Sequence, residues 1–264
     1  IIIGAGAGLS TSAGFEYGGA TFMKHFKYMF HLYGYTDMYS AGFHNFDTSE
    51  DFWGYWSKFI YLNRYQGVKS LYNKLYKLIR DKNYFVLTTN VDHQFQLAGF
   101  DKKRLFYTQG DYGLIQCSIP CHHTTYDNEE IIMKMVEQQK NGKIPSSLIP
   151  ICPRCGKEMT TNLRIDEKFV EDEGWNEHAK LYNDFLNENK FKKVLYLELG
   201  VGFNTPGIIK YPFWRFVNEN KNATYAIINP DCKYIPKEII HQTIKIESDI
   251  DLVISKLLDL SNKK

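Results

Sequence analysis

The sequence lacks several features that would assign it to a specialised class of protein. It contains no apolar run near the roughly 20 residues that a membrane helix needs, and no basic leader with an apolar segment typical of a signal peptide. The formal net charge is only +2 over 264 residues, and the lysines are scattered. A basic face for a nucleic-acid backbone is therefore not expected. We expect a cytoplasmic protein with neither a nucleic acid nor a membrane as partner.

Cysteine is scarce as well, and four of the five cysteines lie in two close pairs. Cys117 and Cys121 form the first pair; Cys152 and Cys155, followed by Gly156, form the second. Four thiols in paired spacing suit a tetrahedral zinc ion, and the second pair resembles a zinc knuckle. The sequence therefore predicts one structural zinc held by these four cysteines.

Three alternatives stay open for the cysteines. His122 or His123 can replace one thiol as a ligand, because the spacing departs from the tightest ribbon pattern, or the thiols can be free. Cys232 is left over and is expected to be a plain buried or half-buried thiol. Cysteines that bind a metal, rather than forming disulfides, are typical of a reducing compartment.

What the chain does contain is enough apolar sequence for a large core, since 44% of it is hydrophobic and 23% is charged. Short apolar runs of the kind that form buried parallel strands alternate with stretches of helical periodicity. This alternation predicts an α/β fold with a Rossmann-type open parallel sheet covered on both faces. The strand candidates are Ile1–Ile3, Tyr84–Leu87, Val194–Leu197 and Tyr225–Ile228; the clearest helices contain Leu71, Leu75, Leu78 and Ile79, or begin near Asp249.

Two stretches interrupt this alternation, and we expect them to build a smaller inserted lobe. Residues 21–62 are rich in aromatic side chains without a clear strand, which predicts helices, and residues 113–160 hold the paired cysteines and predict a zinc module. Residues 1–20, 63–112 and 161–264 would form the larger Rossmann-type lobe of a single domain over 1–264. Because the chain starts within a strand and without Met, we also expect residues to precede Ile1.

A glycine-rich turn follows the first predicted strand. Ile3-Gly4-Ala5-Gly6-Ala7-Gly8-Leu9-Ser10 leads from that strand into a predicted helix start. Glycines allow a diphosphate to approach the backbone, and helix N-terminal amides supply donors. A tight turn without a ligand is the plain alternative, but the strand-turn-helix context favours dinucleotide binding. We expect a side chain at Gly8 to weaken that binding while leaving the fold intact.

The motifs resemble those of the sirtuins, the NAD-dependent protein deacylases and ADP-ribosyltransferases. Gly6-Ala7-Gly8-Leu9-Ser10, with Ser12 and Gly14, is similar to the first sirtuin signature, and Thr88-Thr89-Asn90-Val91-Asp92 is similar to the second. The resemblance continues in family order over nearly the whole chain, at Gly200-Val201-Gly202, Ile228-Asn229 and Ser248-Asp249-Ile250.

The resemblance implies NAD as co-substrate and assigns roles to individual residues. Asn90 would hold the ribose or a water near the reacting carbon, Asp92 would bond the nicotinamide carboxamide, and Gln109 would orient the ribose hydroxyls or the acceptor. Turn formation is the plain alternative for Asn90 and Asp92. The implied cofactor-binding residues are Gly6, Ala7, Gly8, Ser10, Gly14, Thr89, Gly200, Gly202, Asn229 and Ile250.

Departures from the usual sirtuin pattern indicate which class of sirtuins this chain resembles. Most sirtuins carry Pro-Asp-Phe-Arg where this chain has Glu16-Tyr17-Gly18-Gly19, and a catalytic His where it has Gln109 before Gly110. Histidine can act as a base near neutral pH, whereas glutamine has no titratable group. These departures resemble the macrodomain-linked class M sirtuins, whose activity is protein mono-ADP-ribosylation.

We therefore expect an NAD-dependent protein mono-ADP-ribosyltransferase, with NAD and the acceptor protein meeting in the cleft between the two lobes. The resemblance implies a lipoyl-carrying acceptor similar to the glycine cleavage H protein, and a macrodomain hydrolase that reverses the modification. Two alternatives stay open. One is an NAD-dependent lysine deacylase with another base, such as His93. The other is a non-catalytic NAD-binding or zinc-based interaction module.

Overall fold

The computed structural model of the chain describes residues 1–232 and 234–263, and it divides into two compact units. The first comprises residues 1–14, 68–109 and 173–264, and the second comprises 15–67 and 110–172. The sequence placed the corresponding boundaries after residues 20, 62, 112 and 160. The largest difference is the last one, and it has a physical reason given below.

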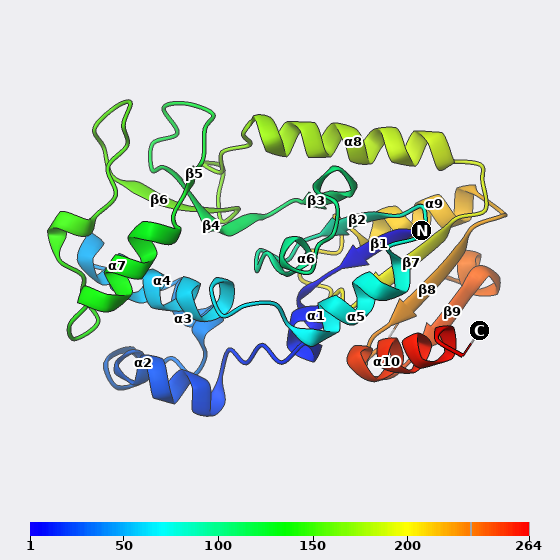
Figure 1. Cartoon of the computed structure of the whole chain (residues 1–264), viewed down its shortest axis with the longest axis horizontal. Helices are drawn as coiled ribbons and strands as arrows, with labels where there is room; N and C mark the ends of the chain where they lie inside the picture. Colours follow the sequence, from blue (N-terminus) through cyan, green and yellow to red (C-terminus); the bar gives the residue numbers. More distant parts are fainter. Residues whose placement is uncertain (233, 264) are drawn as a thin grey trace. The chain divides into compact units, whose positions relative to one another are not determined.

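The first unit is built on a six-stranded parallel sheet with the order β3-β2-β1-β7-β8-β9 (Figure 1). The four apolar runs chosen from the sequence supply its four central strands, so the prediction of an open parallel sheet is confirmed. The strands are β1 (Ile2–Ala5), β2 (Phe85–Thr88), β3 (Leu105–Tyr107), β7 (Leu195–Leu199), β8 (Thr224–Ile228) and β9 (Thr243–Ile246).

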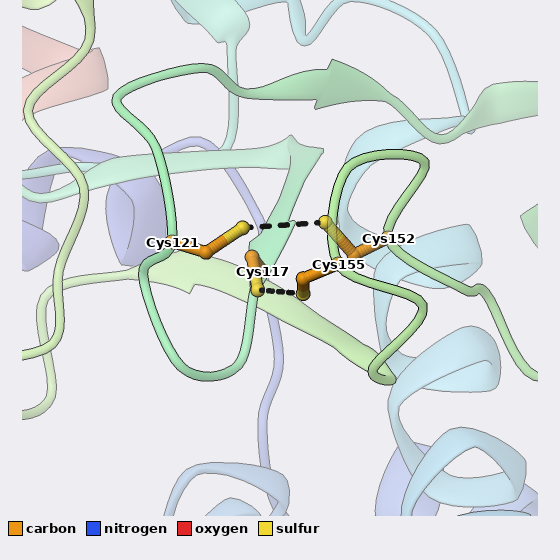
Figure 2. A group of neighbouring side chains, drawn as sticks. All are labelled: Cys117, Cys121, Cys152 and Cys155. Atoms are coloured by element: carbon orange, nitrogen blue, oxygen red, sulfur yellow. Dashed lines mark hydrogen bonds between the residues drawn. The ribbon is translucent and has the colours of Figure 1, made fainter.

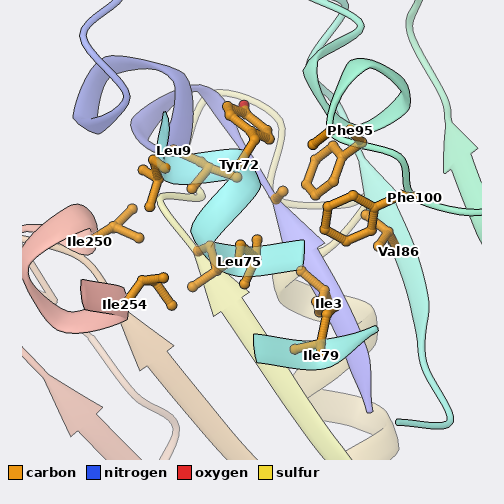
Figure 3. Packing of buried hydrophobic residues seen from close by; sticks show 14 of the residues in the cluster. Ile3, Leu9, Tyr72, Leu75, Ile79, Val86, Phe95, Phe100, Ile250 and Ile254 are labelled. Atoms are coloured by element: carbon orange, nitrogen blue, oxygen red, sulfur yellow. The ribbon is translucent and has the colours of Figure 1, made fainter. Parts of the chain in front are cut away.

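Helices cover both faces of this sheet. One face carries α1 (Ala7–Ser12), α5 (Ser70–Ile79), α6 (Gln94–Leu97) and α10 (Ile250–Ser261), whose apolar side chains pack with those of β1 and β2 (Figure 3). The other carries α8 (Glu173–Asn189), α9 (Lys210–Glu219) and the short helix η3 (Lys237–Gln242). A further short helix, η1 (Lys102–Arg104), precedes β3.

The helices begin and pack as their sequences indicate. Leu71, Leu75 and Ile79 of α5 recur at helical spacing and are buried against the sheet. Asp249 caps α10, because its carboxylate accepts a hydrogen bond from the amide of Leu252 at 3.0 Å. The same carboxylate accepts from Ser12 Oγ at 2.8 Å, which joins the end of α1 to the start of α10.

The second unit combines helices with a small antiparallel sheet of order β5-β4-β6. Its aromatic stretch folds into helices, as expected, with Phe26, Trp53 and Tyr55 among the buried side chains. The helices are α2 (Gly19–Tyr33), α3 (Met38–Gly42), α4 (Ser49–Arg64), α7 (Glu129–Gln138) and η2 (Ser146–Leu148); the strands are β4 (Gly110–Cys117), β5 (Tyr126–Asp127) and β6 (Met159–Leu163).

Pairing between β4 and β6 explains why the second unit extends to residue 172. Cys117 lies opposite Met159, and Gly110 lies opposite Leu163. The side-chain amide of Asn162, within β6, donates to the carbonyl of Val170 at 3.1 Å, which holds the segment after β6 to the same sheet. Residues 161–172 therefore contact the second unit, whereas the sequence placed them in the larger lobe.

Among the helices that the structure describes, none has the length and apolar character needed to cross a membrane.

Candidate functional site

Several of the predicted cofactor residues directly follow strands at the carboxyl edge of the parallel sheet. The chain leaves β1 for β2 and β3 on one side and later adds β7, β8 and β9 on the other, so the sheet order reverses between β1 and β7. Open α/β sheets bind ligands at such a switch point. Gly6 follows β1 and Gly200 follows β7, directly at this place.

The glycines after β1 pack against the backbone after β7. The amide of Gly6 donates to the carbonyl of Leu199 at 3.0 Å, and that of Gly8 donates to the carbonyl of Gly200 at 2.9 Å. A Cβ on Gly8 would lie 2.7 Å from Gly200 Cα, and one on Gly200, where φ is +62°, would lie 2.4 Å from the nitrogen of Leu9. Side chains cannot occupy such positions without a backbone shift.

This contact corrects the expectation for Gly8. Its lack of a side chain is required by the approach of two protein segments, and its amide is already used within the fold. A side chain at Gly8 would therefore disturb the fold itself. Ala7, by contrast, is exposed at the first position of α1, and Gly202 has no atom within 4 Å of its Cβ position.

The second signature forms a buried hydrogen-bond network beside this turn. Asp92 Oδ2 accepts from Ser10 Oγ at 2.6 Å and from the hydroxyl of Tyr72 at 3.4 Å. Asn90 Nδ2 donates to the carbonyl of Gly6 at 3.0 Å and approaches the Tyr72 hydroxyl at 3.5 Å. The structure thus brings Ser10, Asn90 and Asp92 together, although they come from two separate motifs. Tyr72 was not predicted, because on α5 it reads as an ordinary core position.

Gln109 lies in the turn between β3 and β4. The amide of Thr108 donates to the carbonyl of Thr88 at 3.0 Å, which fixes the end of β3 against β2. Gln109 is half-buried, and its Nε2 donates to Thr108 Oγ1 at 3.3 Å. Its amide can donate and accept hydrogen bonds, but it cannot take up a proton at neutral pH. His93, the alternative base, adopts a left-handed backbone conformation with φ of +62° at the start of α6.

Gly202 and Asn229 line a pocket of about 330 Å³ at the ends of β7 and β8. Asn229 Oδ1 accepts from the amide of Asp231 at 3.3 Å, so it also shapes its own turn. The remaining lining residues are Val201, Phe203, Lys210, Ile227, Asp231, Cys232 and Tyr234. Cys232 is buried, as predicted.

Three other implied cofactor residues have roles within the fold itself. Thr89 follows β2, and its amide donates to the carbonyl of Ala5 at 3.1 Å. Gly14 is exposed with a φ of +88°, which explains its lack of a side chain. Ile250 packs its side chain in the core between the sheet and α10, so only its backbone is suited to meet a ligand.

The paired cysteines form a cluster in the second unit. Their four sulfur atoms lie within 4.8 Å of one another (Figure 2). Cys117 Sγ is 3.5 Å from Cys155 Sγ, and Cys121 Sγ is 3.7 Å from Cys152 Sγ. Tetrahedral Zn–S bonds of about 2.3 Å place sulfur atoms about 3.8 Å apart. The four cysteines can therefore hold one structural zinc ion.

The surroundings of the thiols shift their pKa values in opposite directions. Desolvation opposes ionisation of Cys152, but hydrogen bonds from the amides of Cys155 and Arg154 outweigh it and lower the pKa of this thiol to about 7. Desolvation and the neighbouring thiols raise the pKa of Cys121 to about 12. A divalent cation among them would favour the thiolate form. His122 lies outside the cluster; its Nδ1 is 3.0 Å from Cys121 Sγ and its Nε2 is 2.8 Å from the Tyr126 hydroxyl.

The chain resembles two curated proteins. It is 40% identical over 260 residues to a protein ADP-ribosyltransferase of Staphylococcus aureus, covering 98% of this chain and 82% of the relative. It is 30% identical over 224 residues to a probable bifunctional ADP-ribose hydrolase/ADP-ribosyltransferase of Fusarium oxysporum f. sp. cubense, covering 80% of this chain but only 37% of that protein. No protein-family model matches the chain.

Solved structures of sirtuins share the fold. A Sir2 homologue in complex with NAD has a TM-score of 0.66 at 15% identity, covering 99% of this chain and 89% of that one. A Sir2 bound to an acetylated peptide has a TM-score of 0.63 at 17% identity, covering 100% and 93%. The sirtuin-like fold predicted from the motifs is therefore confirmed. The bacterial relative, 40% identical over nearly the whole chain, shows that this chain belongs to the protein ADP-ribosyltransferases.

Proposed function

We propose that this chain transfers the ADP-ribose of NAD to an acceptor protein and releases nicotinamide. The observation that carries the proposal is the network of Ser10, Asn90 and Asp92 beside the glycine turn, at the switch point of a sirtuin-type sheet. The bacterial relative is named a protein ADP-ribosyltransferase, and the solved Sir2 homologue contains NAD.

The reaction breaks the bond between nicotinamide and the anomeric carbon of the ribose. Nicotinamide leaves with the bonding electron pair, the anomeric carbon gains oxocarbenium character, and an acceptor side chain attacks it and gives up a proton. This chemistry depends on positioning and on electrostatic support of the developing charge. Asn90 would hold the ribose, and Asp92 would accept a hydrogen bond from the carboxamide of the leaving group.

Ser10 and Tyr72 would keep the Asp92 carboxylate in place for that role. Both hydroxyls lie at the same carboxylate oxygen, Oδ2, while Oδ1 accepts from the amide of Gln94 at 3.1 Å. These three donors fix the orientation of the buried carboxylate. It is therefore a fixed acceptor that needs no rearrangement when NAD binds.

Gln109 would orient the ribose hydroxyls or the acceptor. A deacylating sirtuin needs a base for the ribose hydroxyl, and a glutamine in that place cannot serve as one. The carboxamide can instead hold a hydroxyl by donating and accepting hydrogen bonds. This difference favours transfer to a protein over deacylation.

The acceptor that we propose is a lipoyl-carrying protein similar to the glycine cleavage H protein, with a macrodomain hydrolase removing the modification. The support is the resemblance of the motifs to class M sirtuins, and the name of the fungal relative, which joins a hydrolase and a transferase. A cytoplasmic location also belongs to this proposal, since five cysteines without a disulfide suit a reducing compartment.

Intact-mass spectrometry of carrier proteins after incubation with this chain and NAD tests the proposal. We expect the lipoylated carrier to gain the mass of one ADP-ribose, and nicotinamide to appear in equal amount. The same carrier without lipoate and a reaction without NAD are the matched controls. A carrier that stays unmodified while another protein gains ADP-ribose would contradict the acceptor but retain the activity. Nicotinamide release with no protein modified would contradict the transferase.

A further inference from the structure

An ion pair without a role in the proposed chemistry lies buried in the first unit. Glu198 of β7 and Lys210 of α9 have side chains that are 0% and 2% exposed. Glu198 Oε1 accepts from Lys210 Nζ, and Oε2 accepts from the hydroxyl of Tyr225 at 2.6 Å. A buried ion pair is often no more stabilising than apolar side chains of the same volume. Stability alone therefore does not explain these charges.

The position of the pair in the chain suggests what it does. Glu198 lies one residue before the end of β7, and Lys210 is the first residue of α9. The pair thus joins both ends of the connecting segment 199–209. Tyr225 on the neighbouring strand β8 anchors the same carboxylate. The base of this segment is consequently held by two strands and a helix.

The segment closed by this pair carries the residues that border the glycine turn and the pocket. Gly200 accepts the hydrogen bond from Gly8, and Gly202 and Phe203 line the pocket. The ring centroid of Phe203 lies 5.0 Å from Lys210 Nζ, a distance typical of a cation–π contact. Lys210 lines the pocket as well. The ammonium group therefore contacts the pocket wall directly as well as closing its base.

We propose that Glu198, Lys210 and Tyr225 form a positioning network that holds the segment 200–203 in the shape that binds NAD. This inference rests on the proposed function. A segment ordered before binding loses less conformational entropy when the ligand arrives, so affinity rises. The hydrogen bonds of the network are made among protein side chains alone, so we expect them to be equally strong in the ground state and the transition state. Loss of the network should raise KM and leave kcat nearly unchanged.

A variant that lacks only one charge of the pair would not distinguish a loss of positioning from a loss of stability. Burial raises the pKa of Glu198, while Lys210 and Tyr225 act to lower it. A lone Glu198 would be buried without its counter-ion, and the fold would suffer for that reason. Replacing all three polar groups by apolar ones avoids this, since neither charge of the network is left buried without its counter-ion.

The test is the triple variant Glu198→Leu/Lys210→Met/Tyr225→Phe in the full chain. We expect its melting temperature to stay within a few degrees of the parent's, as for apolar replacements of buried ion networks. We expect the Kd of NAD, measured by calorimetry, to rise roughly tenfold. The KM of NAD for nicotinamide release should rise by a similar factor, with kcat within about twofold.

Two further variants make the result decisive. Lys74→Met removes the cation of the Lys74–Asp251 pair on the other face of the sheet, and it should leave the Kd of NAD unchanged. Tyr225→Phe removes one hydroxyl only and should weaken NAD binding by about threefold; it decides the matter if the triple variant does not fold.

A folded triple variant that binds NAD with the parent's Kd would overturn the inference. If the triple variant does not fold, an unchanged Kd of NAD in Tyr225→Phe would overturn it instead. A weaker Kd in Lys74→Met equal to that of the triple variant would also overturn it, because the effect would then not be specific to the pocket. A parent protein that does not bind NAD would instead contradict the proposed function.

Discussion

The glycines of the two glycine motifs differ in whether the fold requires them. Gly8 and Gly200 allow two backbone segments to meet, as a Cβ on either would lie closer than 3.0 Å to the other segment. Gly202 is exposed and has open space around its Cβ position. From the motifs alone, all of these glycines are predicted to bind the cofactor. Only the structure separates those that shape the fold from one that can face a ligand.

Alanine substitutions at Gly8 and Gly202 test this distinction. Gly8→Ala should lower the free energy of unfolding by about 1–3 kcal/mol, the usual cost of overpacking, and should weaken NAD binding as a consequence. Gly202→Ala should unfold at the parent's denaturant concentration, because its methyl group meets no protein atom. Urea unfolding followed by circular dichroism measures both. Equal stability of Gly8→Ala and the parent would show that the two segments can separate at no cost.

Elements differ in how well the sequence predicts them. The four central strands contain short runs of buried apolar residues, such as Phe85, Val86 and Leu87 of β2, and this is the pattern that parallel strands require. The edge strands β3 and β9 were missed. β9 has alternating polar residues and is partly exposed, and β3 has only three residues. Edge strands need less apolar sequence, so their signal is weaker.

The small antiparallel sheet was missed for another reason. β4 pairs with β6 more than forty residues later in the chain, and the pairing includes an irregularity between Gly110 and Ile115. Nothing local in either segment specifies that partner. The zinc ligands were nevertheless found, since paired cysteines are recognisable without knowing which strands carry them. Tyr72 and Lys210 were missed because a tyrosine on an amphipathic helix and a single lysine have no distinctive pattern.

The cysteine cluster connects elements that lie far apart in the sequence. Cys117 ends β4, Cys121 follows it, and Cys152 and Cys155 lie on the turn before β6 (Figure 2). The loop between the two pairs contains β5 and α7. A bound zinc ion would therefore close this long connection at its base, and its binding free energy would contribute to folding.

Substitution of one cluster cysteine, with Cys232 as control, tests the zinc site. The purified parent should contain about one zinc per chain. Cys152→Ser should lose most of the metal and melt at a lower temperature, because a three-thiol site binds zinc less tightly. Cys232→Ser, which lies outside the cluster, should keep the full zinc content. Metal analysis by mass spectrometry and calorimetric melting provide the readouts. Full zinc content in a Cys117→Ser/Cys152→Ser variant would exclude the four-cysteine site.

At the scale of the whole molecule, this chain combines a sirtuin fold with the sequence of a protein ADP-ribosyltransferase. It aligns over 98% of its length with a bacterial ADP-ribosyltransferase, and it spans 37% of a fungal relative that carries a hydrolase name as well. The solved structures with this fold include Sir2 proteins bound to NAD and to an acetylated peptide, whereas the curated relatives are named for ADP-ribose transfer. Sirtuin architecture alone does not determine whether lysine or another acceptor reacts.

The reaction of acyl-lysine peptides with this protein and NAD separates transfer from deacylation. General-base catalysis is worth about 10²–10⁴ in rate, so the parent should form almost no O-acyl-ADP-ribose. Gln109→Ala should reduce ADP-ribose transfer by about tenfold or more while the Kd of NAD stays within about threefold, because only hydrogen bonds are lost. Chromatography of the products and calorimetry with NAD measure the two effects.

Gln109→His adds the titratable group of the deacylases and is the sharper variant. We expect no brisk deacylation from it, because the segment Glu16-Tyr17-Gly18-Gly19 departs from the deacylase pattern as well. In the structure this segment leads into α2, and Glu16 accepts a hydrogen bond from Thr21 Oγ1 at 3.0 Å. One imidazole does not rebuild the surroundings that an acyl-lysine substrate requires. Rapid peptide deacylation by the unmodified protein, with no ADP-ribose on any carrier, would mean that a different base, such as His93, performs the chemistry and that the transferase assignment is wrong.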